Sequence, residues 1–287
     1  MDSIQRAVLK SGNSKNPSQE VTPIKRVDNS SINTIESPKT NNQLFVDFAE
    51  CTENTIIDAA GIRTPDLLEE FREIKRHLMR TADSKNDAIR KNHNLIMVSS
   101  CSPNEGKTFT AINLALSLAL EIDRTVLLID ADMMMSGVAN SLGISYEIGL
   151  IDYLTGSVPE LSSLFVKTSM SNFSIIPSGT YSSSVAEYLG SEKMLCLADE
   201  LSVRYPDRII VIDTPPILAS SIPVQMSELV GQVVLVVEAE NTEKNELISS
   251  IEKIDKAKSI SLVLNKVRGV KRKYEYSYNS YGGKNEA

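Results

Sequence analysis

The residues with the clearest chemical potential in this chain are Gly106, Lys107 and Thr108, which follow one another directly. A lysine in this setting can place its charge against the β- and γ-phosphates of a nucleotide, and a threonine hydroxyl can bind the accompanying Mg²⁺. Glycine lets the main chain come close to a phosphate group. These three residues therefore predict a site for a nucleoside triphosphate and Mg²⁺.

Three aspartates stand where such a site needs acidic groups. Asp130 and Asp132 follow an apolar run that begins at residue 125, and Asp213 follows a second run that begins at residue 208. The carboxyl ends of parallel strands meet at the ligand-binding edge of a sheet. We therefore expect the aspartates to lie together, with Asp213 in the place of a Walker B carboxylate that reaches Mg²⁺ directly or through water.

The elements that must position these residues form a strand, a loop and a helix, in the order that a phosphate-binding loop requires. Residues 95–100 are an apolar run of strand length, and Ile112, Ala115, Leu116 and Ala119 follow at helical spacing. The helix start supplies unpaired N–H groups and the positive end of the helix dipole. One departure is that Cys101 occupies the place of the usual first glycine.

Alternating strand and helix patterns continue toward the end of the chain. Strands are predicted at residues 173–177, 233–237 and 260–264, and helices at 192–203 and 242–256. This alternation indicates an α/β fold with a mostly parallel, doubly wound sheet. Asn265 follows the last strand, where its side chain could form a hydrogen bond with an adenine.

Composition limits the classes of partner and compartment. The chain has 287 residues and a net charge of −7, which does not favour nucleic acid or anionic lipid. Its three cysteines are far apart and form no metal-binding spacing, as is typical of a reducing cytosol. No apolar run reaches about 18 residues, the length that a membrane-spanning helix needs.

The first part of the chain has a different composition. Residues 1–42 are rich in Ser, Asn, Lys, Gln, Thr and Pro, a composition that predicts disorder. Residues 44–60 are more apolar and pack either on the domain or on a partner. We expect three parts: a disordered, low-complexity N-terminal extension at 1–60, a nucleotide-binding domain at 61–270 and a tail at 271–287.

A helix is predicted to begin at residues 64–66, where Thr64 can cap it and Pro65 suits the first helical position. Leu67, Phe71, Ile74 and Leu78 form one apolar stripe along it. Glu69, Arg72 and Lys75 recur on a neighbouring face, where charged residues usually face solvent.

The tail is rich in tyrosine and is predicted to be flexible, because residues 274–281 have no aliphatic side chains for packing and are followed by Gly282 and Gly283. Its tyrosines are Tyr274, Tyr276, Tyr278 and Tyr281. A tyrosine cluster beside a nucleotide domain suggests phenol hydroxyls that receive a γ-phosphate.

From about residue 65 onward, these features together resemble the bacterial tyrosine kinase (BY-kinase) family. Within that family, the features most resemble the separate-chain tyrosine autokinases of exosortase and exopolysaccharide gene clusters. The matching signatures are Walker A at 102–108, the extra Walker A′ at 128–132, Walker B at 212–216 and the tyrosine tail. The resemblance implies a P-loop NTPase fold of the deviant Walker type, which partition ATPases share.

The resemblance also implies an ATP-dependent protein-tyrosine autokinase, with ATP and Mg²⁺ as cofactors. Lys107, Asp130 and Asp132 are the implied catalytic residues, and either aspartate could accept the phenol proton. Thr108, Asp132 and Asp213 would bind the metal. The residues implied to contact the nucleotide are Ser102, Asn104, Glu105, Gly106, Lys107, Thr108, Phe109 and Asn265.

The resemblance further implies a ring-like homo-oligomer in which each tail is phosphorylated by a neighbour. Glu69, Arg72 and Lys75 match the family's Glu-x-x-Arg-x-x-Arg oligomerisation motif, with lysine in the last place. The implied partners are a membrane-bound polysaccharide co-polymerase that activates the kinase and a tyrosine phosphatase. The implied location is cytoplasmic, at the inner face of the cell membrane through that partner.

Two other functions remain open from the sequence. One is an ATPase of the division-site or plasmid-partition type, although Ser102 stands where that group usually has a second lysine. The other is a catalytically weak, nucleotide-gated adaptor of a polysaccharide export machine. Met134 makes this second function plausible, because it occupies the place of an arginine that often follows Walker A′ in the family.

Overall fold

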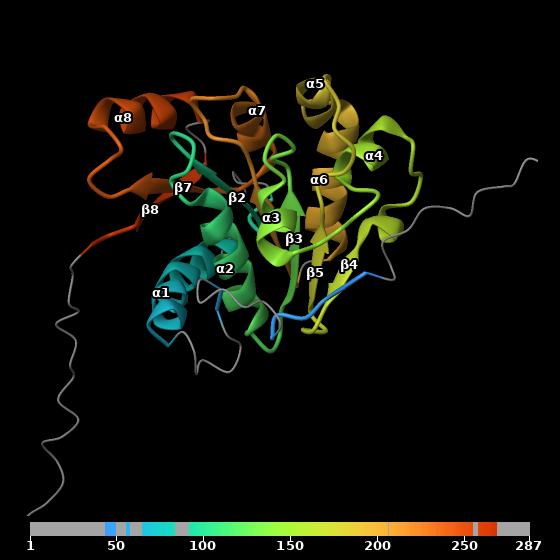
Figure 1. Ribbon diagram of the computed structural model, residues 1–287, viewed down its shortest axis with the longest axis horizontal. Coiled ribbons are helices and arrows are strands. Elements are labelled where there is room, and N and C mark those ends of the chain that lie inside the picture. The colour runs from blue at the N-terminus through green and yellow to red at the C-terminus, as the bar shows by residue number, and fades with distance from the viewer. Residues whose placement is uncertain are drawn as a thin grey trace, which may run out of the picture. The chain divides into compact units, whose positions relative to one another are not determined.

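The computed structural model describes residues 44–49, 56–57, 65–83, 92–205, 207–254 and 258–268. These residues form an α/β fold around one sheet of eight strands (Figure 1), as predicted from the alternating pattern. The predicted disorder of residues 1–42 and the predicted flexibility of the tyrosine tail lie outside the described residues. Within the described residues, no helix combines the length and the apolar composition that crossing a membrane requires.

The sheet is parallel except at one pair of neighbouring strands. Its order is β1-β4-β5-β3-β6-β2-β7-β8, and only β4 and β5 are antiparallel. The strands are β1 (Phe45–Val46), β2 (Leu95–Ser100), β3 (Thr125–Asp130), β4 (Val166–Thr168), β5 (Phe173–Ile176), β6 (Arg208–Asp213), β7 (Gln232–Glu238) and β8 (Ser259–Asn265). The strands that carry the predicted site, β3, β6 and β2, are adjacent at the centre of the sheet, so their carboxyl ends are neighbours.

Helices cover both faces of the sheet. They are α1 (Pro65–Ala82), α2 (Lys107–Ala119), α3 (Gly137–Leu142), α4 (Leu150–Thr155), α5 (Val185–Leu189), α6 (Glu192–Arg204), α7 (Ile222–Leu229) and α8 (Lys244–Lys253), with a 3₁₀ turn at Leu161–Leu164. The apolar side chains of α1, α2 and α3 pack on one face, and those of α4 to α8 pack on the other. The sheet is therefore doubly wound.

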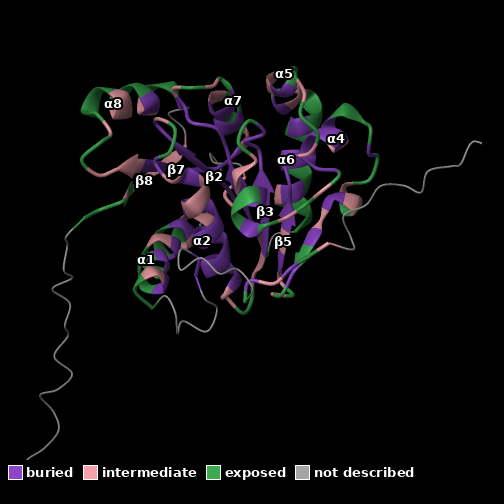
Figure 2. Ribbon diagram, viewed as in Figure 1, coloured by how far each residue is buried: buried purple, intermediate pink, exposed green. Residues whose placement is uncertain are grey.

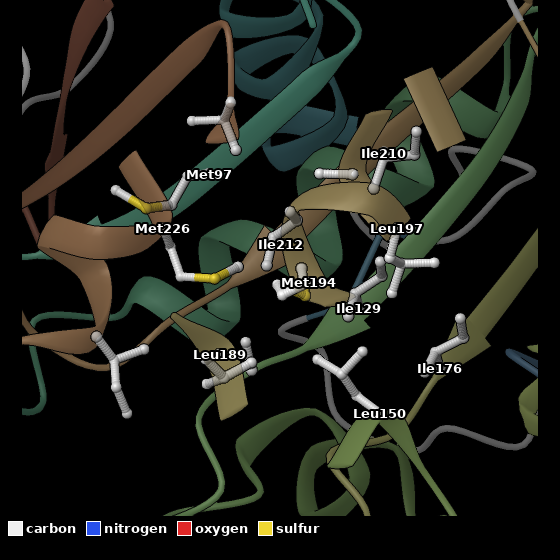
Figure 3. Close-up of a cluster of buried hydrophobic side chains, with 14 of the residues drawn as sticks. Met97, Ile129, Leu150, Ile176, Leu189, Met194, Leu197, Ile210, Ile212 and Met226 are labelled. Carbon is white, nitrogen blue, oxygen red and sulfur yellow. The ribbon is translucent and has the colours of Figure 1, made fainter. Parts of the chain in front are cut away.

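The central strands are buried on both sides, as Figure 2 shows. Such strands are continuous apolar runs rather than alternating ones, which is the pattern that residues 95–98 and 209–212 follow. Figure 3 shows the core on the α4–α8 face, where Met97, Ile129 and Ile212 of the sheet meet Leu150, Leu197 and Met226 of the helices. This packing fixes the strand ends that carry the aspartates.

The first helix begins as predicted, with Pro65 in its first turn, but its buried face is shifted slightly. Leu68, Phe71 and Leu78 are buried, whereas Leu67 and Ile74 are only partly buried. Lys75 also lies on the buried face. The prediction that Phe71 and Leu78 are buried is therefore confirmed. The centre of the buried face lies closer to Lys75 than the predicted apolar stripe does.

Part of the range 1–60, expected to be an extension, belongs to the domain. β1 pairs in parallel with β4, and Phe48 stacks on Phe173 with ring centroids 5.5 Å apart. Ile57 is buried, and its N–H donates to Asn113 Oδ1 over 2.8 Å. Of the two alternatives for residues 44–60, packing on the domain is the one observed for the described residues.

Candidate active site

The phosphate-binding loop connects β2 to α2 and ends at Gly106, the residue before the first turn of α2. Gly106 has φ of 97°, a conformation that glycine adopts without strain. A Cβ atom there would lie 2.0 Å from Asn265 Nδ2. The loop therefore requires glycine at this position, because of both its backbone conformation and the short distance to Asn265. The start of α2 is directed to the carboxyl edge of the sheet.

The predicted lysine, threonine and aspartates converge at this edge. Lys107 Nζ lies 2.6 Å from Asp132 Oδ2, and Thr108 Oγ1 donates to Asp213 Oδ2 over 2.6 Å. Lys107 Nζ also lies 3.2 Å from Thr108 Oγ1. Asp130 and Asp213 are register partners at the ends of β3 and β6. One lysine and three carboxylates thus share a small buried volume.

Burial and mutual repulsion raise the pKa values of two of the carboxyl groups. Burial, followed by the charge of Asp213, raises the pKa of Asp130 to about 8. Burial raises the pKa of Asp213 to about 6, although Lys107 and the Thr108 hydroxyl oppose the rise. Burial alone would lower the pKa of Lys107, but Asp213 and Asp132 outweigh it and raise that pKa. The site therefore holds more negative charge than one lysine can balance, which favours a cation.

The oxygen atoms of the site fit Mg²⁺. Asp132 Oδ1 and Asp213 Oδ1 are buried and accept no hydrogen bond from the residues that the structure describes. The Thr108 hydroxyl, which donates to Asp213, adds a third oxygen. Among the described residues, no cluster of three or more His, Cys, Asp or Glu side chains could hold a metal by itself. Mg²⁺ usually binds through one or two carboxylates, waters and the phosphates of a substrate, so this donor set suits an ion that arrives with a nucleotide.

The structure distinguishes the two aspartates of the Walker A′ segment. Asp130 accepts hydrogen bonds from the N–H groups of Asp132 and Val138, at 3.0 Å and 3.3 Å, through its two oxygens. Asp132 Oδ1 accepts no hydrogen bond from the described part of the chain. Asp130 therefore fixes the backbone that follows β3, and Asp132 has the carboxylate oxygen that remains available to a ligand.

The other loop residues make contacts that the sequence did not predict. The buried Glu105 carboxylate accepts hydrogen bonds from Ser102 N–H, at 2.9 Å, and from the Thr242 hydroxyl. Ser102 Oγ lies 3.4 Å from Glu246 Oε1. Thr242 and Glu246 thus tie the loop to α8. The position of Thr242 at the start of a predicted helix was the only sequence signal for this role.

Asn265, predicted to read an adenine, is engaged by the loop in this structure. Its Nδ2 donates to Glu105 O over 2.9 Å. The neighbouring Lys266 Nζ donates to Asn104 O over 2.6 Å, where Asn104 has a positive φ of 66°. The end of β8 therefore holds the backbone of the phosphate-binding loop. The prediction that Asn265 contacts adenine stays a prediction.

Two other predicted positions have side-chain partners that the sequence did not predict. The ring of Phe109 packs edge-on against Phe71, with centroids 6.1 Å apart, so its side chain faces α1 rather than the loop. Lys75 is mostly buried, and its Nζ donates to Ser117 O over 3.0 Å and lies 2.5 Å from Glu121 Oε1. Lys75 is thus paired within its own chain, and its predicted contact with a neighbouring subunit stays a prediction.

The remaining predicted positions lie at the surface or outside the residues that the structure describes. Glu69 and Arg72 are exposed and pair with each other over 3.0 Å. Met134 is 69% exposed and lies beside the site after Asp132, so the usual arginine position is open to solvent. The predicted phosphoacceptors, Tyr274, Tyr276, Tyr278 and Tyr281, lie outside the described residues.

Comparison with known proteins gives a consistent set of relatives. Residues 67–267 match an AAA domain family. The tyrosine-protein kinase wzc of Salmonella typhimurium is 33% identical over 197 residues, which are 66% of this chain and 27% of wzc. The chain thus spans about a quarter of that relative's length.

A relative of similar length and a solved kinase domain extend the comparison. The tyrosine-protein kinase YwqD of Bacillus subtilis is 31% identical over 194 residues, which are 66% of this chain and 78% of YwqD. The kinase domain of Escherichia coli tyrosine kinase ETK superposes with a TM-score of 0.64 at 25% identity, over 78% of this chain and 86% of that domain.

Proposed function

Because the chain belongs to the bacterial tyrosine kinase family, we propose that it is an ATP-dependent protein-tyrosine autokinase. It transfers the γ-phosphoryl group of ATP to its own tyrosine cluster at Tyr274, Tyr276, Tyr278 and Tyr281. The observation that carries this proposal is the pair of 2.6 Å contacts that bring Lys107 to Asp132 and Thr108 to Asp213. Phosphoryl transfer depends mainly on positioning and on charge neutralisation, which these four residues can supply.

The roles of these residues follow from their contacts. Lys107 and the N–H groups of the loop bind the phosphates, so ATP exchanges the present Lys107–Asp132 ion pair for a lysine–phosphate contact. Thr108, Asp132 and Asp213 would hold Mg²⁺, which neutralises phosphate charge when bound. Asp130 positions the segment after β3.

The acceptor phenol also needs a base at neutral pH, because its ordinary pKa is about 10. Asp132 is our candidate, since its Oδ1 accepts no hydrogen bond within the described residues. Asp130 is the less suitable alternative, because both of its oxygens accept backbone N–H groups.

We further propose a division of the chain and an assembly. The kinase domain extends to about residue 270, and residues 271–287 are the tail that is phosphorylated by a neighbouring subunit. Glu69 and Arg72 are available for a ring-like oligomer because both are exposed on α1. By family resemblance, a membrane polysaccharide co-polymerase activates the kinase at the inner face of the membrane, and a tyrosine phosphatase reverses the reaction. The chain would thereby regulate exopolysaccharide polymerisation and export.

Incubation of the purified chain with ATP and Mg²⁺, followed by mass spectrometry of tail peptides, tests the proposal. Phosphotyrosine at residues 274–281 is the expected result. Release of free phosphate without phosphotyrosine would indicate an ATPase of the partition type instead. Nucleotide binding without either product would indicate a weakly catalytic adaptor, the alternative that the exposed Met134 favours.

A further inference from the structure

A groove of about 940 Å³ lies between α1 and the turn that joins α2 to β3. Its walls include Arg72, Arg76 and Arg80 of α1 and Ile122 and Arg124 of the turn. The helix α2 begins at the phosphate-binding loop and ends at Ala119, so it spans about 20 Å at 1.5 Å per residue. The groove therefore lies at the opposite edge of the sheet from the candidate active site.

The groove has an excess of positive charge on a chain that is negative overall. Five basic and three acidic side chains line it. Two of the acidic ones, Glu121 and Asp83, are already paired with Lys75 and Arg124. Arg76 and Arg80 are exposed and form no ion pair with any residue that the structure describes. These two guanidinium groups are the part of the groove that is free to bind an anion.

The groove also offers apolar surface next to these arginines. Ile122 is 96% exposed, and Met79 lies on the α1 wall. Arginine pairs with phosphate through two parallel hydrogen bonds, and a methionine side chain packs favourably against an aromatic ring. Guanidinium groups beside an apolar contact suit a ligand that carries a phosphate on an aromatic ring.

The spacing of the arginines suggests which segment supplies that ligand. Arg72, Arg76 and Arg80 are four residues apart, which separates them by about 6 Å along a helix. Tyr274, Tyr276 and Tyr278 alternate along the sequence, so in an extended peptide they share one face at intervals of about 6.6–6.8 Å. The two series match closely enough for successive phosphotyrosines to meet successive arginines.

We propose that this groove is a docking site for the phosphorylated Tyr274–Tyr278 segment of a second copy of the chain. This inference depends on the proposed function, which supplies the phosphotyrosines. Each phosphate adds a charge of about −1.5 to −2. Docking takes Arg72 away from Glu69, an exposed pair that contributes little by itself. Phosphorylation would thus change the contacts of the α1 surface.

A synthetic peptide of residues 271–287, phosphorylated on Tyr274, Tyr276 and Tyr278 and carrying a fluorophore, tests the proposal by anisotropy. It is titrated with the full chain after treatment with a phosphatase. We expect the double substitution Arg76→Ala and Arg80→Ala to weaken binding by about tenfold or more, because it removes two charge-assisted contacts. The matched control is Arg204→Ala, an exposed arginine on α6 that should leave binding unchanged.

The peptide itself has two controls. The unphosphorylated peptide should bind about tenfold more weakly or worse, and a peptide whose phosphotyrosines are three residues apart should also bind more weakly. Equal binding of the unphosphorylated peptide, or an unchanged affinity of the double variant, would overturn the proposal. Displacement by inorganic phosphate at the peptide's own concentration would show an anion site only and would also overturn it. Because the peptide is phosphorylated by chemical synthesis, its binding can be measured even if the chain has no kinase activity.

Discussion

Replacing Asp213 with asparagine should stabilise the nucleotide-free chain while removing its function. Asp213 is fully buried beside Asp130, its register partner on β3, and its Oδ2 accepts the Thr108 hydroxyl. Asparagine has nearly the same shape and can still accept that hydrogen bond through its oxygen. It carries no charge, so it removes a buried carboxylate that repels Asp130.

The magnitude follows from the pKa of Asp213. A pKa raised from 3.8 to about 6 means that the folded protein binds this proton more tightly than the unfolded chain does. Two pKa units correspond to about 3 kcal/mol. The stabilising contribution of the bound proton is complete below about pH 4 and is lost as pH rises through about 6. The free energy of unfolding of Asp213→Asn should therefore rise relative to that of the unmodified chain by about 3 kcal/mol as the pH increases from about 4 to about 8.

Urea unfolding of both proteins without nucleotide, at several pH values across this range, measures the difference. Asp123→Asn is the matched control, because it removes one carboxylate from an exposed position. A free-energy difference for Asp213→Asn that does not change with pH, or a variant that is less stable at pH 8, would refute the reasoning. ATP with Mg²⁺ should raise the melting temperature of the unmodified chain and leave that of the variant nearly unchanged.

Three other substitutions test separate parts of the account. Lys107→Ala should weaken ATP binding by about 100-fold in calorimetry, because it removes charge-assisted phosphate contacts; an affinity within about threefold of the original would contradict this role. Gly106→Ala should lower the free energy of unfolding by more than about 1 kcal/mol, because its φ is 97° and its Cβ would lie 2.0 Å from Asn265 Nδ2; unchanged stability in urea would argue against this loop geometry. Phe48→Ala should cost about 3 kcal/mol, because it removes a buried ring and leaves a cavity beside Phe173; a loss below about 1 kcal/mol would mean that this segment is not part of the core.

The parts of the site that could be predicted from sequence are those that depend on local pattern. An apolar run followed by an aspartate identifies the end of a buried strand, and parallel strands bring such ends together. That logic predicted that Asp130, Asp132 and Asp213 lie near Lys107. In the structure Lys107 lies 2.6 Å from Asp132, the adjacent Thr108 donates to Asp213, and Asp130 is the register partner of Asp213. The start of α1 at Pro65 could be predicted for a similar reason, because cap signals are local.

The parts that could not be predicted depend on contacts between distant segments. Lys75 has the sequence position of a surface residue, yet its amine reaches Glu121 and Ser117 O at the far end of α2. β1 has only two residues, too few for a strand pattern, and its pairing with β4 joins segments more than 100 residues apart. Glu105 and Thr242 are likewise brought together only by the fold.

The most direct measurement of the central claim is a mixing experiment with two defective chains. One chain carries Lys107→Ala and keeps its tail tyrosines, and the other keeps Lys107 but has phenylalanine in place of all four. After incubation with ATP and Mg²⁺, mass spectrometry reads phosphate on the tail of the Lys107→Ala chain. We predict phosphotyrosine on that tail in the mixture and none when the chain is incubated alone. Its absence from the mixture, or its presence in the Lys107→Ala chain alone, would contradict phosphoryl transfer between subunits at this site.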